Sequence, residues 1–329
     1  MIVTLTANPS IDRTVELDEP LERGAVQRAV ATREDPGGKG VNVTRALRAA
    51  RVTSIAVLPA APGDPMLAAL DAESVPYRAV PIRGRIRSNL TIAEAGGPTT
   101  KINEPGPELD EAAQRAVVDA VVEASQGAEW LVLAGSLPPG APDDFYARVV
   151  RAVRAETHPA PRIAVDTSGP ALAALVDAEL AIDVIKPNAE ELAELLGRSS
   201  EAELEAGPDA AIALARTIPA SRVRTSLVTL GAVGAAVVAP EGSWFAAAPK
   251  ITARSSVGAG DCSLAGYLIA SVEGAHPSAA LASAVAYGAA AASLPGSVVP
   301  TRSQVDPDRV VVTEAGADAA SAPQGAPHE

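Results

Sequence analysis

The residues best suited to chemistry form one short segment, Val257–Asp261, which reads VGAGD. The small and apolar residues that follow it, over 262–272, favour a helix, so the segment stands at a helix start. Glycine lets the backbone turn with a positive φ, and the first N–H groups of a helix lack partners and attract anions. We expect the backbone of three residues to hold an anion: Gly258, Ala259 and Gly260. Asp261 would then either cap the helix or accept a proton from a substrate hydroxyl.

Other familiar catalytic and phosphate-binding patterns are absent from the sequence. The segment Gly37–Gly40 (GGKG) contains a lysine without the spacing of a Walker loop, and 258–260 lacks the third glycine of a dinucleotide loop. Neither HExxH nor GxSxG occurs. The three histidines stand in predicted loops or in the tail, where we expect solvated surface residues: His158, His276 and His328.

Composition narrows the class of protein. The 329 residues suffice for one large α/β domain, and the net charge of −13 argues against a nucleic-acid partner, because such proteins carry a basic face. No apolar run approaches the ~18 residues of a membrane span, and no signal peptide is recognisable. The single cysteine, Cys262, allows no intrachain disulfide. We therefore expect a cytoplasmic protein that contacts neither nucleic acid nor membrane, in which a few local cations can still hold a phosphorylated substrate.

Short apolar runs alternate with helical patterns along most of the chain. The predicted strands are nearly continuously apolar, as in a parallel sheet buried on both faces: Ile2–Thr6, Trp130–Ala134, Ile163–Asp166, Asp183–Ile185 and Leu227–Leu230. Helices are predicted over about 40–50, 109–125, 142–156, 169–177, 188–196, 208–218, 260–274 and 277–294. This alternation predicts an α/β fold, a three-layer α/β/α sandwich with a mostly parallel central sheet, whose ligands bind at the carboxyl ends of the strands.

Two regions, about 12–34 and 77–103, break this rhythm. They alternate apolar and polar residues around turn signals, which indicates β-hairpins that form a small second sheet. We expect this sheet to be a lid over the site or a dimer surface, and an edge extension of the main sheet is the alternative. Residues 1–312 would form a single domain that includes the lid, and the Ala/Gly/Pro/Ser-rich tail, 313–329, is expected to be disordered.

Six motifs resemble, in their order along the chain, those of the ribokinase-like, or PfkB, family of sugar kinases. They are Gly37–Arg45 (GGKGVNVTR), Gly135–Gly140 (GSLPPG), Asp166–Gly169 (DTSG), Lys186–Leu192 (KPNAEEL), Val228–Gly234 (VTLGAVG) and Val257–Asp261. Each motif alone is weak, whereas six in order over roughly residues 1–310 leave little room for coincidence. The resemblance implies a ribokinase-like kinase domain that transfers a phosphoryl group from ATP to a sugar hydroxyl.

Three further segments are similar to the branch of this family that acts on phosphorylated ketohexoses: Leu5–Asp12, Ile86–Leu90 and Thr100–Pro107. Within that branch the sequence is most similar to the 1-phosphofructokinases, which implies conversion of fructose 1-phosphate to fructose 1,6-bisphosphate. Activities of the 6-phosphofructokinase and tagatose-6-phosphate kinase types stay open, because all three substrates present a phosphate and similar hydroxyls. Outside the enzymes, the alternative is a non-catalytic sugar-phosphate sensor on the same fold, although a sensor needs no base beside an anion site.

The resemblance also implies roles for the residues that bind the sugar and transfer the phosphoryl group. Asp261 would be the catalytic base, and the backbone of 258–260 would bind the transferring group. Asp12 would accept hydrogen bonds from sugar hydroxyls, while Gly38 and Asn42 would let the sugar lie close to the helix that begins there. Cys262 replaces the serine that commonly follows the aspartate in this branch, and we expect a modest effect from this change.

A substrate that already carries a phosphate needs cations away from the transfer site. The candidates are Arg28, Arg87 and Lys101 in the predicted lid, Lys39, and the hydroxyl of Ser136. Arg87 is the strongest of them, because a guanidinium binds phosphate with two hydrogen bonds. The alternative for these charges is a solvated surface position.

For the nucleotide, the resemblance implies two loops that each follow a strand. Their candidate residues are Lys186, Asn188, Thr229, Gly231 and Gly234. Glu191 completes the family's NxxE pattern, which is linked to Mg²⁺ held through water, and the alternative for Glu191 is a solvated helix face. The expected cofactors are thus ATP and Mg²⁺, the partners are small molecules, and contact between lids would form a homodimer.

Overall fold

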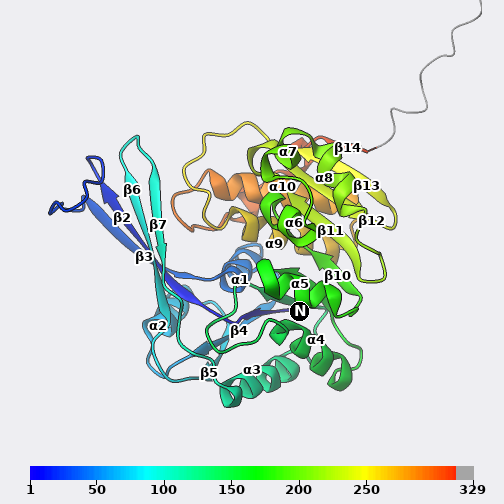
Figure 1. Cartoon of the computed structure of the whole chain (residues 1–329), viewed down its shortest axis with the longest axis horizontal. Helices are drawn as coiled ribbons and strands as arrows, with labels where there is room; N and C mark the ends of the chain where they lie inside the picture. Colours follow the sequence, from blue (N-terminus) through cyan, green and yellow to red (C-terminus); the bar gives the residue numbers. More distant parts are fainter. Residues whose placement is uncertain (316–329) are drawn as a thin grey trace, which may run out of the picture.

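The computed structural model describes residues 1–315. Ten strands form one large sheet (Figure 1), in the spatial order β14, β13, β12, β11, β10, β9, β8, β1, β4, β5. Their bounds are β1 Ile2–Thr6, β4 Ser54–Ala60, β5 Tyr77–Pro81, β8 Trp130–Ala134, β9 Arg162–Asp166, β10 Ile182–Ile185, β11 Val223–Thr229, β12 Gly234–Ala239, β13 Gly242–Ala247 and β14 Val312–Glu314. In this spatial order, each pair of neighbours from β11 to β5 is parallel. Strands β12, β13 and β14 pair antiparallel and form the other edge.

Two interior strands of this sheet show why the sequence contains continuous apolar runs. Strands β1 and β8 are buried at every residue and pair in register, with Leu5 opposite Leu133. Strands covered on both faces have no position for a solvated side chain, so they read as continuous rather than alternating apolar segments. The predicted fold class, a mostly parallel sheet between two helical layers, is confirmed.

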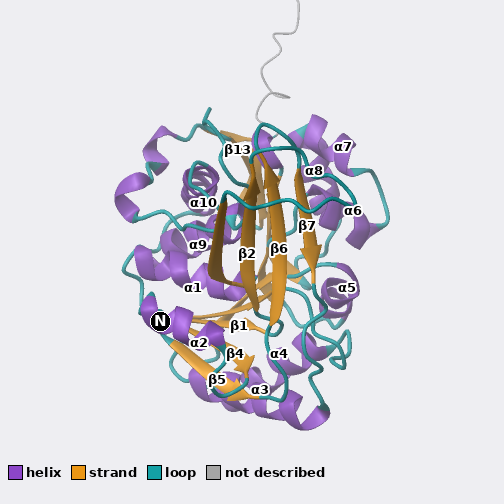
Figure 2. Ribbon diagram, turned by 90° about the vertical axis from the view of Figure 1, so that its left-hand side faces the viewer, coloured by secondary structure: helices purple, strands orange, loops and turns teal. Residues whose placement is uncertain are grey.

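Helices cover both faces of the large sheet (Figure 2). The apolar cluster on one face includes side chains of α1, α9 and α10, and the cluster on the other includes α3, α4, α5, α6, α7 and α8. The helix bounds are α1 Lys39–Ala49, α2 Pro65–Ala72, α3 Glu111–Ala124, α4 Phe145–Glu156, α5 Gly169–Asp177, α6 Ala189–Leu196, α7 Glu201–Ala206, α8 Pro208–Ala215, α9 Ala259–Val272 and α10 Pro277–Ala292, with short 3₁₀ turns at Gly231–Val233, Arg302–Gln304 and Pro307–Arg309. None of the helices within residues 1–315 has the length and hydropathy that crossing a bilayer requires.

A second sheet of four strands stands beside the large one (Figure 1). Its spatial order is β3, β2, β6, β7, with bounds Ala31–Gly37, Ser10–Leu17, Arg87–Glu94 and Thr99–Asn103. We call this sheet the lid. It is separate from the large sheet, so the alternative of an edge extension is wrong for these strands. The alternative holds for one segment, because β5, predicted within the lid region 77–103, pairs with β4 in the large sheet.

Other boundaries also differ from the prediction. Strands β4, β12 and β13 and helices α2 and α7 have no counterpart among the predicted elements. Thr313 and Glu314 were expected in a disordered tail, but they belong to β14 and pair with Phe245 and Trp244. Pairing with an existing sheet edge can order a strand that its own sequence does not specify. The remainder of the predicted tail, 316–329, lies outside the described residues.

Candidate active site

The glycine-rich segment forms the N-terminus of α9, as the sequence predicts. Gly258 is the N-cap and adopts the left-handed conformation, with a φ of 75°, which favours glycine at this position. Within the described residues, the N–H of Gly260 has no hydrogen-bond partner, and that of Ala259 has only a long contact of 3.4 Å with the carbonyl of Ser256. The turn therefore presents backbone donors at the positive end of a 14-residue helix.

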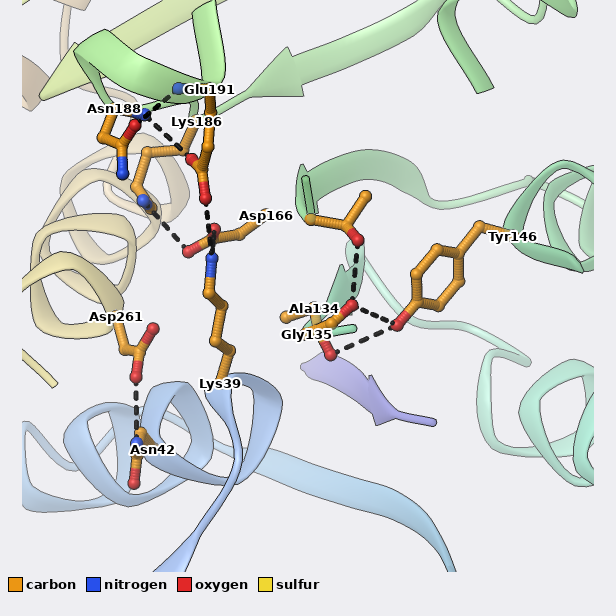
Figure 3. A network of polar contacts seen from close by, with 11 residues as sticks. Lys39, Asn42, Ala134, Gly135, Tyr146, Asp166, Lys186, Asn188, Glu191 and Asp261 are labelled. Carbon is orange, nitrogen blue, oxygen red and sulfur yellow. Dashed lines mark hydrogen bonds and ion pairs between the residues drawn. The ribbon is translucent and has the colours of Figure 1, made fainter. Parts of the chain in front are cut away.

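Asp261 lies in the first turn of α9 and is 7 % exposed. Asn42 Nδ2, from α1, donates a hydrogen bond of 2.9 Å to Asp261 Oδ2 (Figure 3). Burial, followed by the nearby negative charge of Asp166, raises the pKa of Asp261 to about 6, although Lys39 and the Asn42 hydrogen bond oppose the shift. A carboxylate with a raised pKa is a stronger base than a solvated one and is still ionised at neutral pH, which suits it to accept a proton.

Asp166, at the end of β9, is fully buried between two lysines (Figure 3). Lys39 Nζ lies 2.7 Å from its Oδ1, and Lys186 Nζ lies 3.1 Å from its Oδ2. Burial opposes ionisation of Asp166, but the charges of Lys186 and Lys39 outweigh it and lower the pKa of this carboxyl. The pKa of Lys39 is raised, because Asp166, Glu191 and Asp261 overcome the effect of its burial. Two ammonium groups thus converge on one carboxylate close to Asp261.

Lys39 is the more accessible of these two lysines, since 34 % of its side chain is exposed, against 4 % for Lys186. The sequence suggested Lys39 as a partner of the sugar phosphate. In the structure its ammonium group lies 2.7 Å from Asp166 and 3.4 Å from Glu191.

Asn188 and Glu191 form a reciprocal cap at the start of α6. Asn188 Oδ1 accepts from the Glu191 N–H at 2.7 Å, and Glu191 Oε2 accepts from the Asn188 N–H at 2.9 Å. Such a capping box fixes both side chains. Glu191 Oε1 keeps only the long contact with Lys39, so it has capacity for a water molecule. Residues 1–315 contain no cluster of three or more His, Cys, Asp or Glu side chains that could hold a metal ion.

Asp12, predicted to bind sugar hydroxyls, lies at the end of the lid where β2 and β6 begin, which we call the lid root. Asp12 Oδ1 accepts hydrogen bonds from Ser10 Oγ at 2.8 Å and from Asn89 Nδ2 at 3.1 Å. The strand register places Ser10 beside Arg87 and Asp12 beside Asn89, so all four side chains lie on one face of the lid. Asn89 is a site candidate that was not predicted from the sequence. Its position within Ile86–Leu90, a segment similar to the family branch, could have indicated it.

Arg87 and Ser136 lie beside each other. Arg87 Nη2 lies 3.5 Å from Ser136 Oγ, and Nη1 donates to the Glu104 carbonyl at 3.3 Å. The Nε atom of Arg87 is buried without a partner among the described residues. Burial lowers the pKa of this arginine, with the charge of Asp12 opposing the shift. A half-buried guanidinium with long contacts and an unused donor has the capacity to bind an anion.

Arg28 and Lys101 are not brought to this root. Arg28 is exposed in the connection after Leu17, the last residue of β2, and so lies towards the far end of the lid. Lys101 pairs with Thr91, two positions along β6 from Asn89, and is exposed. By strand alternation Lys101 shares the face of Asp12, farther from the root.

Gly38 closes the other side of the root. It is the N-cap of α1 with a φ of 101°, and a Cβ atom there would lie 2.7 Å from Thr6 Cγ2 and 3.2 Å from Pro9 Cα. Only glycine fits this position without displacing β1 and the loop after it. The close approach brings the start of α1, which carries Lys39 and Asn42, against the carboxyl end of the central strand.

A cavity of about 650 Å³ lies on the other side of the α9 N-terminus. It contains all three residues predicted in the second nucleotide loop: Thr229, Gly231 and Gly234. Its remaining walls are mostly small or apolar and come from α9, α10 and the segment 248–256. The Thr229 N–H donates to the Pro187 carbonyl at 3.0 Å, which ties this loop to the Lys186–Asn188 loop. Ala259 and Gly260 line the same cavity, so its occupant would reach the anion turn.

Sequence reasoning assigned no role to two buried residues beneath the site. Asp166 was visible only as part of a family motif, and its terminal position on a predicted strand was the available signal. Tyr146, in α4, donates to the Gly135 carbonyl at 2.9 Å and so supports the loop that carries Ser136 (Figure 3). Nothing in the local sequence connects Tyr146 to that loop, because the contact depends on how α4 packs.

Comparison with known proteins places this geometry in a family. Residues 5–303 match the family model described as pfkB family carbohydrate kinase. The 1-phosphofructokinase of Xanthomonas campestris is 34 % identical over 83 % of this chain and 85 % of its own length. The ATP-dependent 6-phosphofructokinase isozyme 2 of Mycobacterium tuberculosis is 32 % identical over 93 % and 88 %.

Two solved structures of carbohydrate kinases have a similar fold. Phosphofructokinase-2 from Escherichia coli, crystallised in complex with substrates and products, superposes with a TM-score of 0.83 at 31 % identity and covers 92 % of this chain and 96 % of its own. Ribokinase from Thermotoga maritima, with a TM-score of 0.72 at 18 % identity over 92 % of this chain and 97 % of its own, shares the fold. The fold and the site thus define a ribokinase-like phosphotransferase. The chain belongs to the pfkB family of carbohydrate kinases and is an ATP-dependent sugar kinase.

Proposed function

We propose that this kinase phosphorylates a ketohexose monophosphate, and that its substrate is fructose 1-phosphate, converted to fructose 1,6-bisphosphate. The observation that carries the proposal is the position of Asp261. Asp261 lies in the first turn of α9, and Gly260 of the same turn lines the 650 Å³ cavity. Asp261 also accepts a hydrogen bond from Asn42 of α1, the helix whose N-cap, Gly38, packs against the loop that leads into the lid. A base between an anion turn and a second anion site suits transfer to an acceptor that is already phosphorylated.

In the proposed reaction, Asp261 accepts the proton of the sugar hydroxyl. Its Oδ2 is held by Asn42, and no described residue hydrogen-bonds to Oδ1, so Oδ1 is the atom available for the proton. The hydroxyl oxygen then forms a bond to the γ-phosphorus of ATP, and the bond between that phosphorus and the ADP oxygen breaks. The N–H of Gly260 and the ammonium group of Lys39 stabilise negative charge on the transferring group.

The nucleotide would occupy the cavity between the Thr229–Gly234 loop and α10, with its phosphates towards Gly260. Lys186 holds Asp166, and through it Lys39, in place for these phosphates. Mg²⁺, when bound, would neutralise charge on the phosphates, and Glu191 is the residue placed to hold it through water.

The phosphate of the acceptor sugar would bind Arg87 and Ser136, and the sugar hydroxyls would bind Asp12 and Asn89 at the lid root. This side separates phosphorylated from free sugars. The preference for fructose 1-phosphate over its isomers rests on the segments shared with 1-phosphofructokinases. Relatives named as 1- and as 6-phosphofructokinases have nearly equal identity, so 6-phosphofructokinase and tagatose-6-phosphate kinase activities remain the alternatives.

The direct test measures ADP release with Mg-ATP and each of four acceptors: fructose 1-phosphate, fructose 6-phosphate, tagatose 6-phosphate and free fructose. The proposal predicts the highest kcat/KM for fructose 1-phosphate. A preference for another phosphorylated ketose would keep the mechanism and replace the substrate. Turnover of free fructose alone would contradict the phosphate site at Arg87. If no acceptor stimulated ADP release, a sensor would be favoured over an enzyme of this specificity.

We also propose that two chains associate through their lids. On the face of the lid opposite Asp12, strand alternation gathers Val15, Leu90, Ile92 and Ile102, and Ile102 is 54 % exposed. None of these four residues belongs to an apolar cluster of the chain. A second lid packed on this face would bury them. Light scattering should give twice the chain mass, and a monomer mass would contradict the dimer.

A further inference from the structure

Arg45, in α1, is buried although the proposed reaction makes no use of it. It is 6 % exposed, and its guanidinium contacts three other segments of the chain. Nε and Nη2 form a two-pronged contact with Glu73, the C-cap of α2, at 2.7 and 2.8 Å. Nη1 lies 3.3 Å from the Pro36 carbonyl at the root of the lid and 3.0 Å from the Ser297 carbonyl. A guanidinium held by a carboxylate and two carbonyl groups has little freedom to rotate.

The same Nη1 atom also contacts Asn42, one helical turn earlier, at 3.3 Å from Oδ1. Because a guanidinium can only donate, the contact requires that the amide oxygen of Asn42 face Arg45. The amide nitrogen must then face the opposite way, where it donates to Asp261 Oδ2 at 2.9 Å. The contacts form a continuous chain from Glu73 through Arg45 and Asn42 to Asp261.

We propose that Arg45, fixed by Glu73, is a positioning residue that orients the Asn42 amide and thereby holds Asp261 with Oδ1 towards the acceptor hydroxyl. The inference rests on the proposed role of Asp261 as the base. Arg45 itself touches neither substrate nor the reacting atoms. Without Arg45, the Asn42 amide would be free to rotate and would no longer hold Asp261 Oδ2. The Asp261 carboxylate would then adopt rotamers in which its Oδ1 does not meet the acceptor hydroxyl.

Three charged groups influence Asp261 from the elements around it: Lys39 on α1, Asp166 at the end of β9, and Lys186 after β10. None of the three forms a hydrogen bond or ion pair with Arg45 in the described residues. Replacement of Arg45 by lysine keeps the positive charge and leaves these groups in place. Its effect on Asp261 therefore reports the hydrogen-bond chain rather than a change in local charge.

The kinetic test uses Arg45→Lys, with Arg48→Lys as the matched control, because Arg48 is an exposed arginine of the same helix. A lysine cannot reproduce the two-pronged contact with Glu73 together with the contact to Asn42. Arg45→Lys should lower kcat by roughly 10- to 100-fold, the scale of a misplaced catalytic group, with the KM values for both substrates within a few-fold. Arg48→Lys should match the parent. A kcat of Arg45→Lys within twofold of the parent would overturn the proposal.

A double-mutant cycle tests whether Arg45 acts through Asn42. If it does, Arg45→Lys should change kcat less than twofold in an Asn42→Ala background, because the group that it orients is already gone. An equal loss in both backgrounds would overturn the proposal and leave Arg45 with a general structural role. If Arg45→Lys proves too unstable to assay, Glu73→Gln takes its place in the cycle, and about a fivefold loss is expected from the weaker anchor.

One readout requires no turnover. Carboxyl ¹³C NMR follows the titration of Asp261 in the parent chain and in Arg45→Lys, with Arg48→Lys as control. The Asn42 hydrogen bond favours the ionised form, so its loss should raise the pKa of Asp261 above the parent value. An unchanged titration would overturn the positioning role. If the pKa of Asp261 is raised in Arg45→Lys but the parent chain phosphorylates none of the four acceptors, the positioning role stands and the proposed function is wrong.

Discussion

The two halves of the proposed active site are constructed differently. The nucleotide half consists of backbone and small side chains at helix and strand ends, with a preformed cavity and a fully paired cap at Asn188 and Glu191. The acceptor half consists of longer side chains on the lid, where the contacts of Arg87 are long and its Nε is buried without a partner in residues 1–315. Buried polar groups are normally hydrogen-bonded. The nucleotide half thus offers a preformed cavity and open backbone donors, whereas the acceptor half offers a charged side chain whose contacts a ligand would complete.

If the two halves bind different substrates, Arg87→Ala should raise the KM of the sugar phosphate only. Loss of charge-assisted hydrogen bonds to the sugar phosphate should raise its KM by roughly 100-fold, with the KM for ATP nearly unchanged. Steady-state kinetics with each substrate varied in turn measures both constants. Arg85→Ala is the control, because Arg85 is exposed just outside β6. Equal increases in the two KM values would remove Arg87 from the acceptor half.

The converse prediction concerns the cavity. Ala289 lies on α10 and lines the cavity, so Ala289→Phe would fill space that the nucleotide needs. The KM for ATP should rise by about tenfold, equivalent to about 1.4 kcal/mol, while the KM for the sugar phosphate changes little. Ala279→Phe is the control, since Ala279 is exposed on the same helix. A similar loss of affinity for both substrates would mean that the halves are not independent.

Where the two halves meet, the base is maintained at a cost in stability. Its pKa is raised by burial and by Asp166 to about 6, so the folded state binds the proton more tightly than the unfolded chain does. The stabilisation from this proton is complete below about pH 4 and is lost as the pH rises through 6. Asp261→Asn, which never ionises, should therefore unfold several degrees above the parent at pH 7, with no such advantage at pH 4. Calorimetry at the two pH values checks this, and a lower Tm for the variant at pH 7 would contradict it.

The smallest effect is expected at Cys262, which follows the base but belongs to neither half. It is 1 % exposed and packs in the apolar cluster beneath α9 and α10. Burial raises the pKa of its thiol, so the group stays protonated and takes no part in proton transfer. Cys262→Ser should leave kcat within a few-fold of the parent. A large gain or loss would show that this position reaches the reacting groups.

The sequence predicts the nucleotide half better than the acceptor half for a physical reason. Turns such as Gly258–Asp261 are local, because the residues that bind are neighbours in the chain and their glycines mark the conformation. Lid residues meet only through strand register. The sequence therefore favours Arg87 over Arg28 and Lys101 on side-chain chemistry alone, and strand register is what brings Arg87 to the root. Contacts between distant segments were not predictable at all. The contact of Arg45 with Glu73, across 28 positions, depends on how α1 packs beside α2.

The proposed mechanism requires Asp261 to be the catalytic base between the two halves. The measurement is kcat for Asp261→Asn with Mg-ATP and fructose 1-phosphate, together with the dissociation constant of each substrate. The account predicts that kcat falls by about a thousandfold or more, while both dissociation constants stay within a few-fold of the parent. Turnover within tenfold of the parent, with both substrates bound, would contradict it.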